Sequence, residues 1–250
     1  MNKFIYALVF VLVVLVIIFS YKTKDYRLNF FPDLSEKETS SSGTKELIDV
    51  VSKPIVFDAQ RKFLTALYRE KHTGDCNREK DGLDVCVTIK PKIIILHMTD
   101  LETLETSFDY MKEPVLKEER DKLLSRSYDR VNVSVHFMID RDGTIYSLMP
   151  ENYMARHAMG VNHLAIGVEN VGMNHTGPTR EQIDSDVKLV RYLMSKYNIP
   201  AKDVYSHAEV AELRDKKSPF FVEQEKDYFM PKYCGEKVIT EVRKRLGQAG

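Results

Sequence analysis

Two histidines, His97 and His207, have the type and position that most directly indicate chemistry. Of the seven histidines in the chain, these two follow apolar runs, "KPKIIILHM" and "DVYSH". In α/β proteins, ligands gather at the carboxyl ends of strands, where the chain leaves the sheet. Two neutral imidazoles there can hold zinc with a third protein ligand and leave the fourth position for water. This shared position makes His97 and His207 the candidates for a zinc site, with surface or hydrogen-bonded core histidines as the alternative.

A hydrolytic zinc site also needs a base, and Glu169 is the candidate. It ends the apolar segment "LAIGVE", where a carboxylate is out of place. Bound zinc lowers the pKa of its water toward 7, and a base within hydrogen-bond reach can then take the proton. The pattern alone equally allows a solvent-facing carboxylate on an edge strand.

The elements that must position these residues alternate along the chain. Thr179 and Gln182 have the capping-box spacing at the start of a long helix that Pro200 ends. Asp142-Gly143 lies between two β-rich runs and predicts a hairpin. We expect strands ending at residues 98, 173 and 207, and helices over 57–70, 115–127, 180–199 and 231–246. This order predicts an α/β fold: a single layered domain with a central mixed β-sheet flanked by helices.

The N-terminal segment differs from the rest. Residues 4–21, "FIYALVFVLVVLVIIFSY", are uncharged, and at about 1.5 Å per residue they span roughly 27 Å, close to the bilayer thickness. We interpret residues 1–21 as a transmembrane anchor, with a cleaved signal segment as the alternative. Residues 22–53 are polar and predict a tether, and residues 54–250 form the domain.

The balanced charge argues against nucleic acid as a partner, and the cysteine spacing leaves the redox state of the cysteines open. Lys+Arg and Asp+Glu both number 37 in the 250 residues, which argues against nucleic acid as a partner. Cys76 and Cys86 bracket a turn, and both a disulfide and two free thiols are compatible with this spacing. Cys234 stands alone. We expect a monomer.

Several segments, in order, resemble the zinc-dependent N-acetylmuramoyl-L-alanine amidases, which share their fold with peptidoglycan recognition proteins. The resemblance covers residues 91–246, and the segments that carry it are "IIILHMT", "VSVHFMIDRDGTIYSLMPE", "ARHAMG", "HLAIGVENVG", "TREQIDSDVKLVRYLMSKYNIP" and "VYSHAEVA".

The resemblance implies a role for each matching residue. His97 and His207 would be zinc ligands, and Glu169 the catalytic base. The residues that match the family's hairpin would serve mainly as scaffold, and His136 would line the cleft. His157 and Arg156 would contact substrate. In the family a Trp usually occupies the place of Arg156, and this chain contains no Trp.

The third zinc ligand is where the family pattern breaks. The family carries Lys-x-Asp-Pro-Gly after its second histidine, with Cys replacing the Asp in some relatives, and this string is absent here. We predict Asp227 as the ligand and Lys226 as the cation that steadies the oxyanion, with Asp215 and Ser218 as alternatives. A serine in the ligand position would leave a non-catalytic module that binds peptidoglycan.

The resemblance thus implies a Zn²⁺-dependent amidase that hydrolyses the bond between N-acetylmuramic acid and L-alanine in peptidoglycan or its fragments. The alternative is a muropeptide-binding module with a degraded zinc site. Because peptidoglycan lies outside the cytoplasmic membrane, we expect a membrane-anchored protein with its domain on that side. Lys22, Lys24 and Arg27 outnumber Lys3, however, and the positive-inside rule favours the opposite orientation.

Overall fold

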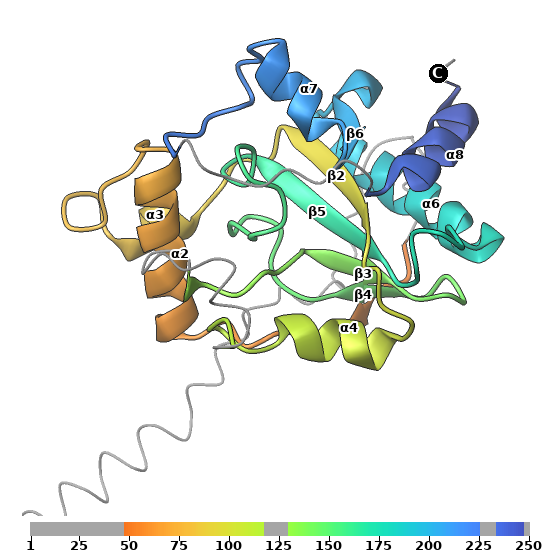
Figure 1. The fold of residues 1–250 in the computed structure, drawn as a ribbon, viewed down its shortest axis with the longest axis horizontal. Coiled ribbons are helices and arrows are strands. Elements are labelled where there is room, and N and C mark those ends of the chain that lie inside the picture. Colours follow the sequence, from red (N-terminus) through yellow and green to blue (C-terminus); the bar gives the residue numbers. More distant parts are fainter. Residues whose placement is uncertain (1–47, 118–129, 226–233, 248–250) are drawn as a thin grey trace, which may run out of the picture. The chain divides into compact units, whose positions relative to one another are not determined.

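A six-stranded sheet runs through the protein, of which the computed structural model describes residues 48–117, 130–225 and 234–247 (Figure 1). The strand order is β1-β4-β3-β5-β2-β6. Neighbouring strands are parallel except for the antiparallel pair β3 and β4, so the predicted mixed sheet is confirmed. The strands are β1 (Val51–Ser52), β2 (Ile93–Met98), β3 (Phe137–Ile139), β4 (Ile145–Ser147), β5 (Ala165–Asn170) and β6 (Val204–Ser206).

Helices flank this sheet, as expected for the fold class. Figure 1 shows α6 and α8 near β2 and β6, α4 below β3 and β4, and α2 with α3 at the left of the view. The α-helices are α2 (Ala59–His72), α3 (Leu83–Val87), α4 (Leu104–Met111), α6 (Arg180–Tyr197), α7 (Val210–Asp215) and α8 (Glu236–Leu246), and a short 3-10 helix, η2, spans Ala201–Asp203.

The two faces of the sheet have different roles because side chains alternate along a strand. Ile94, Leu96 and Met98 of β2 point to one face, where they form the main core with apolar residues of α6 and α8. His97 lies between Leu96 and Met98 and therefore points to the opposite face. On that face, separate apolar clusters around Met138 and around Ile95 flank the histidine.

The structure confirms the helix start and the hairpin turn that local signals in the sequence predicted. The Thr179 side chain accepts from the Gln182 backbone N–H, and the Gln182 side chain accepts from the Thr179 N–H, which completes the capping box of α6. In the hairpin, the Gly143 N–H donates to the Asp140 carbonyl over 2.9 Å, and Gly143 has a φ of +86°. The helix expected over 115–127 falls largely outside the described residues.

The segment before β2 is built into the same unit. Arg61 of α2 is buried and donates to the carbonyl oxygens of Val56 (2.6 Å) and Met111 (2.8 Å). Cys76 and Cys86 form a disulfide beside α2. None of the helices in the described ranges is long and apolar enough to span a bilayer, and the apolar segment 1–21 lies outside those ranges.

Candidate metal centre

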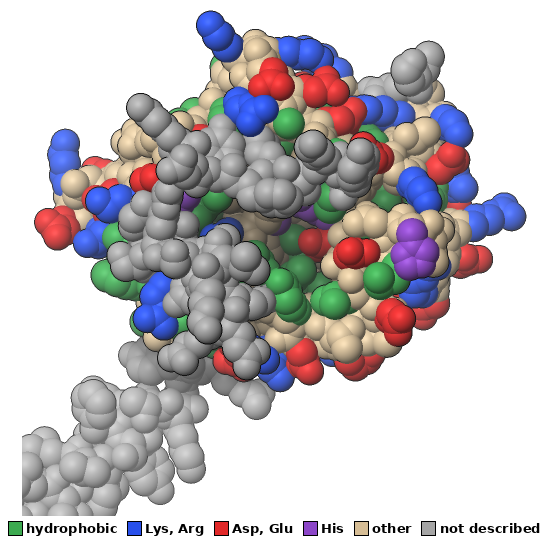
Figure 2. Space-filling view, viewed as in Figure 1, with side chains coloured by type: hydrophobic (Ala, Val, Ile, Leu, Met, Phe, Trp, Pro, Cys, Tyr) green, Lys and Arg blue, Asp and Glu red, His purple; other side chains and the backbone are tan. Residues whose placement is uncertain are grey.

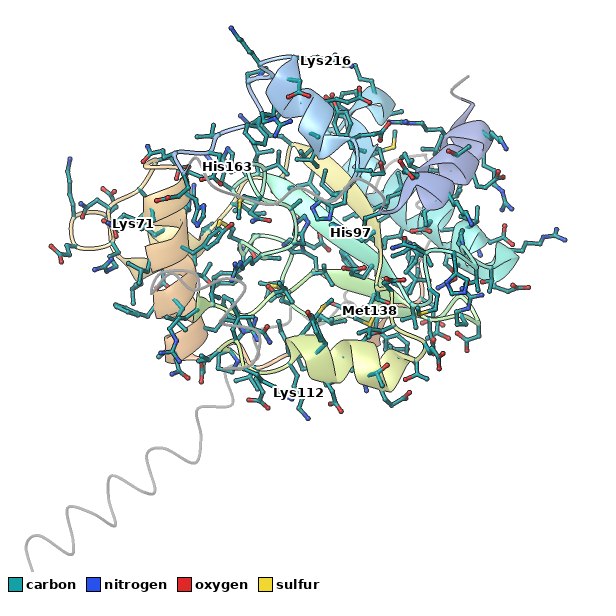
Figure 3. The ribbon with its side chains drawn as sticks, in the orientation of Figure 1. Lys71, His97, Lys112, Met138, His163 and Lys216 are labelled. Atoms are coloured by element: carbon teal, nitrogen blue, oxygen red, sulfur yellow. A yellow bond between two sulfur atoms is a disulfide. The ribbon has the colours of Figure 1, made fainter. Side chains whose placement is uncertain are left out.

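His97 and His207 lie side by side where β2 and the neighbouring edge strand β6, which run parallel, end. β2 pairs with β6 through Leu96 and Ser206, and the His207 N–H donates to the Leu96 carbonyl over 3.1 Å. The two imidazole rings are 4.6 Å apart between centroids. Figure 3 places His97 near the middle of the sheet. The two histidines that were predicted to share a site are therefore brought together.

Cys234 completes this group. One ligand atom each of His97, His207 and Cys234 lies within 4.8 Å of the others, and no other set of three His, Cys, Asp or Glu residues in the described part of the chain is arranged in this way. The Cys234 sulfur lies 3.9 Å from Nδ1 of His97. Two imidazole nitrogens and one thiolate are a ligand set that zinc accepts, with one position left open.

The chain reaches this place because a glycine follows the cysteine. Gly235 has a φ of +78°, in the left-handed region, and a Cβ on it would overlap the Leu96 carbonyl oxygen. The Ala208 N–H also donates to the Cys234 carbonyl over 3.2 Å, which ties the start of α8 to the residue after His207. The Cys-Gly dipeptide before the last helix was the signal for this ligand, which sequence reasoning missed.

Burial fixes the protonation of these groups when no cation is bound. Burial holds the pKa of His97 well below 6.5 and lowers the pKa of His207 to about 4, so both imidazoles are neutral and have a lone pair to give. Burial raises the pKa of the Cys234 thiol to about 12, with the Glu169 charge adding to it. A bound dication would reverse this effect, because it stabilises the thiolate.

Glu169 stands directly across from His97 on the neighbouring strand β5. The side chain is 9% exposed, and its Oε2 is buried without a hydrogen-bond partner. Burial raises its pKa to about 8. A carboxyl group that points to the same sheet face as His97, with one oxygen unused, is placed to exchange a proton at this centre.

The alternatives for the third ligand differ in where they lie. Asp215 is at the exposed end of α7, where its carboxylate accepts from the Arg214 guanidinium over 2.7 Å, away from the histidine pair. Ser218 Oγ accepts from the Phe220 N–H over 3.3 Å. Asp227 and Lys226 lie outside the described residues, so their predicted roles stay predictions.

Two residues predicted at the substrate side are buried in the scaffold. His136 is 0% exposed, and its ring nitrogens pair with the Tyr153 carbonyl at 2.8 Å and with the Gly167 N–H at 3.0 Å. Arg156 is 7% exposed, and its guanidinium lies 5.0 Å from the Tyr68 ring of α2. Neither side chain reaches an open surface in this structure, and the contacts of His136 and Arg156 with substrate stay predictions.

His157, also predicted to contact substrate, lies against His97. Its Nδ1 is 3.0 Å from His97 Nε2, and the two rings meet edge to face. Figure 2 shows this face of the molecule hollowed near its centre, with histidine and hydrophobic atoms around the hollow. The contact with substrate stays a prediction, whereas the contact with His97 is direct.

The centre therefore combines three zinc-type ligands with a buried acid on an α/β sheet. Such a set is typical of metal-dependent hydrolases, a class in which a cation and a carboxyl group act on one water molecule.

Comparison with known proteins identifies the family within this class. Residues 88–220, more than half of the 250-residue chain, match the family model described as N-acetylmuramoyl-L-alanine amidase (Amidase_2). No curated protein matches. The chain belongs to the N-acetylmuramoyl-L-alanine amidase family, and it is a peptidoglycan amidase.

Similar solved structures include two from Clostridium intestinale URNW. The N-acetylmuramoyl-L-alanine amidase LysC is 26% identical over 64% of this chain and 88% of its own, with a TM-score of 0.40. The endolysin amidase LysCS is 27% identical over 64% and 86%, with a TM-score of 0.41. A mutant endolysin from Bacillus subtilis is 21% identical over 70% and 97%, with a TM-score of 0.42.

Proposed function

We propose that this amidase works with one zinc ion held by His97, His207 and Cys234, and that its substrate is the amide between N-acetylmuramic acid and L-alanine. The observation that carries the proposal is the meeting of these three ligand atoms within 4.8 Å at the carboxyl end of β2. When bound, zinc would act as a Lewis acid that acidifies a water and polarises the scissile carbonyl.

Glu169 is the proposed general base. Its carboxyl group faces the same side of the sheet as His97, and its free Oε2 can accept the proton of the attacking water. A nearby dication favours the carboxylate form and so offsets the effect of burial, which raises the Glu169 pKa to about 8. The same oxygen can then return the proton to the nitrogen of the leaving L-alanine.

The substitution Glu169→Gln tests this assignment, since glutamine keeps the shape of the side chain but cannot take the proton. We expect zinc binding to persist and release of stem peptides from purified peptidoglycan to fall by about 10² to 10⁴-fold. Peptide release at the wild-type rate would exclude Glu169 as the base. A zinc-free wild-type protein that still binds muropeptides would instead support a recognition module.

We also propose that residues 1–21 anchor a monomeric enzyme in the membrane, with residues 54–250 on the peptidoglycan side. The support is the uncharged run of residues 4–21 and the location of the substrate. A reporter enzyme that is active only outside the cytoplasm, fused after Gly250, tests this placement against the opposite one, which the basic residues after the run favour.

A further inference from the structure

His157 occupies a tightly specified position between the sheet and the metal centre. The His157 and Ala158 N–H groups both donate to Asn162 Oδ1, over 2.9 and 2.8 Å, and Asn162 is buried. The ring lies against Gly167 of β5, where a Cβ would be 2.7 Å from its Cγ. Backbone and ring are thus both held, and only glycine at position 167 leaves room for the imidazole.

Both ring nitrogens of His157 have a defined neighbour. Nε2 lies 3.4 Å from the Ala165 carbonyl oxygen, and Nδ1 lies 3.0 Å from Nε2 of His97. A carbonyl oxygen can only accept, so Nε2 of His157 must carry the ring proton. In a neutral imidazole the other nitrogen, Nδ1, is then an acceptor.

This arrangement determines the tautomer of His97. Because Nδ1 of His157 accepts, the proton of neutral His97 must be on its Nε2, from which it is donated to His157. Nδ1 of His97 then has a lone pair, and this is the nitrogen that lies 3.9 Å from the Cys234 sulfur. Partners beyond the ligands themselves commonly fix the tautomer and ring orientation of metal-binding histidines.

We propose that His157 is a positioning residue: by accepting the Nε2 proton of His97, it holds His97 in the tautomer whose Nδ1 faces the metal position. The proposal rests on the proposed zinc site. It assigns to a neutral imidazole the part that a carboxylate or backbone carbonyl more often takes beside a metal-binding histidine.

The test compares two substitutions in the full-length protein. Asparagine keeps an acceptor oxygen near the place of Nδ1, whereas alanine removes it. We expect His157→Ala to weaken zinc binding by about 10- to 100-fold, measured by competition with a chromophoric chelator, and His157→Asn to stay within a few-fold of wild type. The exposed His175 provides the control, since His175→Ala should change nothing.

The ring ¹⁵N shifts of the metal-free protein give a second reading that does not depend on zinc or on activity. Wild-type His97 should carry its proton on Nε2, and His157→Ala should show a mixture of tautomers. A wild-type His97 protonated on Nδ1, or a folded His157→Ala variant that binds zinc as tightly as wild type, would overturn the proposal. If His157→Ala does not fold, the tautomer of His97 in the wild-type protein still tests the proposal. If wild-type protein binds no zinc, the proposed function fails, and the ¹⁵N result still stands by itself.

Discussion

Asp186 offers a test of the buried polar structure behind the metal centre. This residue of α6 is 0% exposed, its Oδ1 accepts from the Asn170 amide over 3.3 Å, and its Oδ2 has no partner. Burial raises its pKa from 3.8 to about 8. The folded protein therefore keeps a proton on Asp186 at pH values where the unfolded chain has lost it.

The sign of the pH dependence follows from this difference. Above about pH 4 unfolding releases the proton, so stability decreases as pH rises until the folded state also ionises near pH 8. At about 1.36 kcal/mol per pH unit, the loss attributable to Asp186 between pH 5 and pH 8 is up to about 4 kcal/mol. Asparagine cannot ionise and can still accept from Asn170, so Asp186→Asn should remove this loss.

Urea unfolding of metal-free wild type and Asp186→Asn at several pH values measures the effect, and the difference at each pH cancels the other titrating groups. We expect the advantage of Asp186→Asn to grow by up to about 4 kcal/mol from pH 5 to pH 8. Asp184 on the same helix, which is ion-paired with Arg245 at the surface, is the control, and Asp184→Asn should show no such trend. A pH-independent difference for Asp186→Asn would refute the reasoning.

Two further predictions concern the glycine beside Cys234 and the disulfide beside α2. Gly235→Ala should cost about 1–3 kcal/mol of stability and weaken zinc binding, because the new Cβ would overlap the Leu96 carbonyl. Gly247 also has a positive φ but lies in open space. Gly247→Ala should therefore cost only about 1 kcal/mol and leave zinc binding intact. Reducing the Cys76–Cys86 disulfide, whose cysteines are ten residues apart, should lower the free energy of unfolding by about 3 kcal/mol, measured by thermal unfolding with and without reductant. Equal zinc affinity in both glycine variants, or an unchanged melting temperature after reduction, would contradict these expectations.

Much of the sheet and its two histidines could be predicted because each depends on a local pattern. The run "IIIL" before His97 is the pattern of a strand buried on both faces, and β2 is fully buried. The Thr179–Gln182 capping box likewise depends on residues three apart, and the helix begins there. Both histidines were expected at strand ends, and the parallel pairing of β2 with β6 brings His207 beside His97.

The third ligand was missed because its position depends on tertiary contacts, and the Cys-Gly dipeptide before the last helix is the one local signal for it. Cys234 is separated from His207 in sequence, and it reaches the centre only because Gly235 lets the backbone pass close to Leu96. The burial of His136 and Arg156 likewise depends on packing across the sheet and against α2, which no spacing in the sequence shows. The helix α4 was also missed, because its eight residues make only about two turns, which is too short for a clear helical period.

The zinc content of four proteins tests the central claim most directly: wild type, Cys234→Ala, Asp227→Ala and Asp215→Ala, each dialysed against a weak chelator. With His97, His207 and Cys234 as the ligands, wild type, Asp227→Ala and Asp215→Ala should each retain one zinc per chain, and Cys234→Ala should lose it together with peptidoglycan hydrolysis. Zinc retained by Cys234→Ala but lost by Asp227→Ala would contradict the proposed centre.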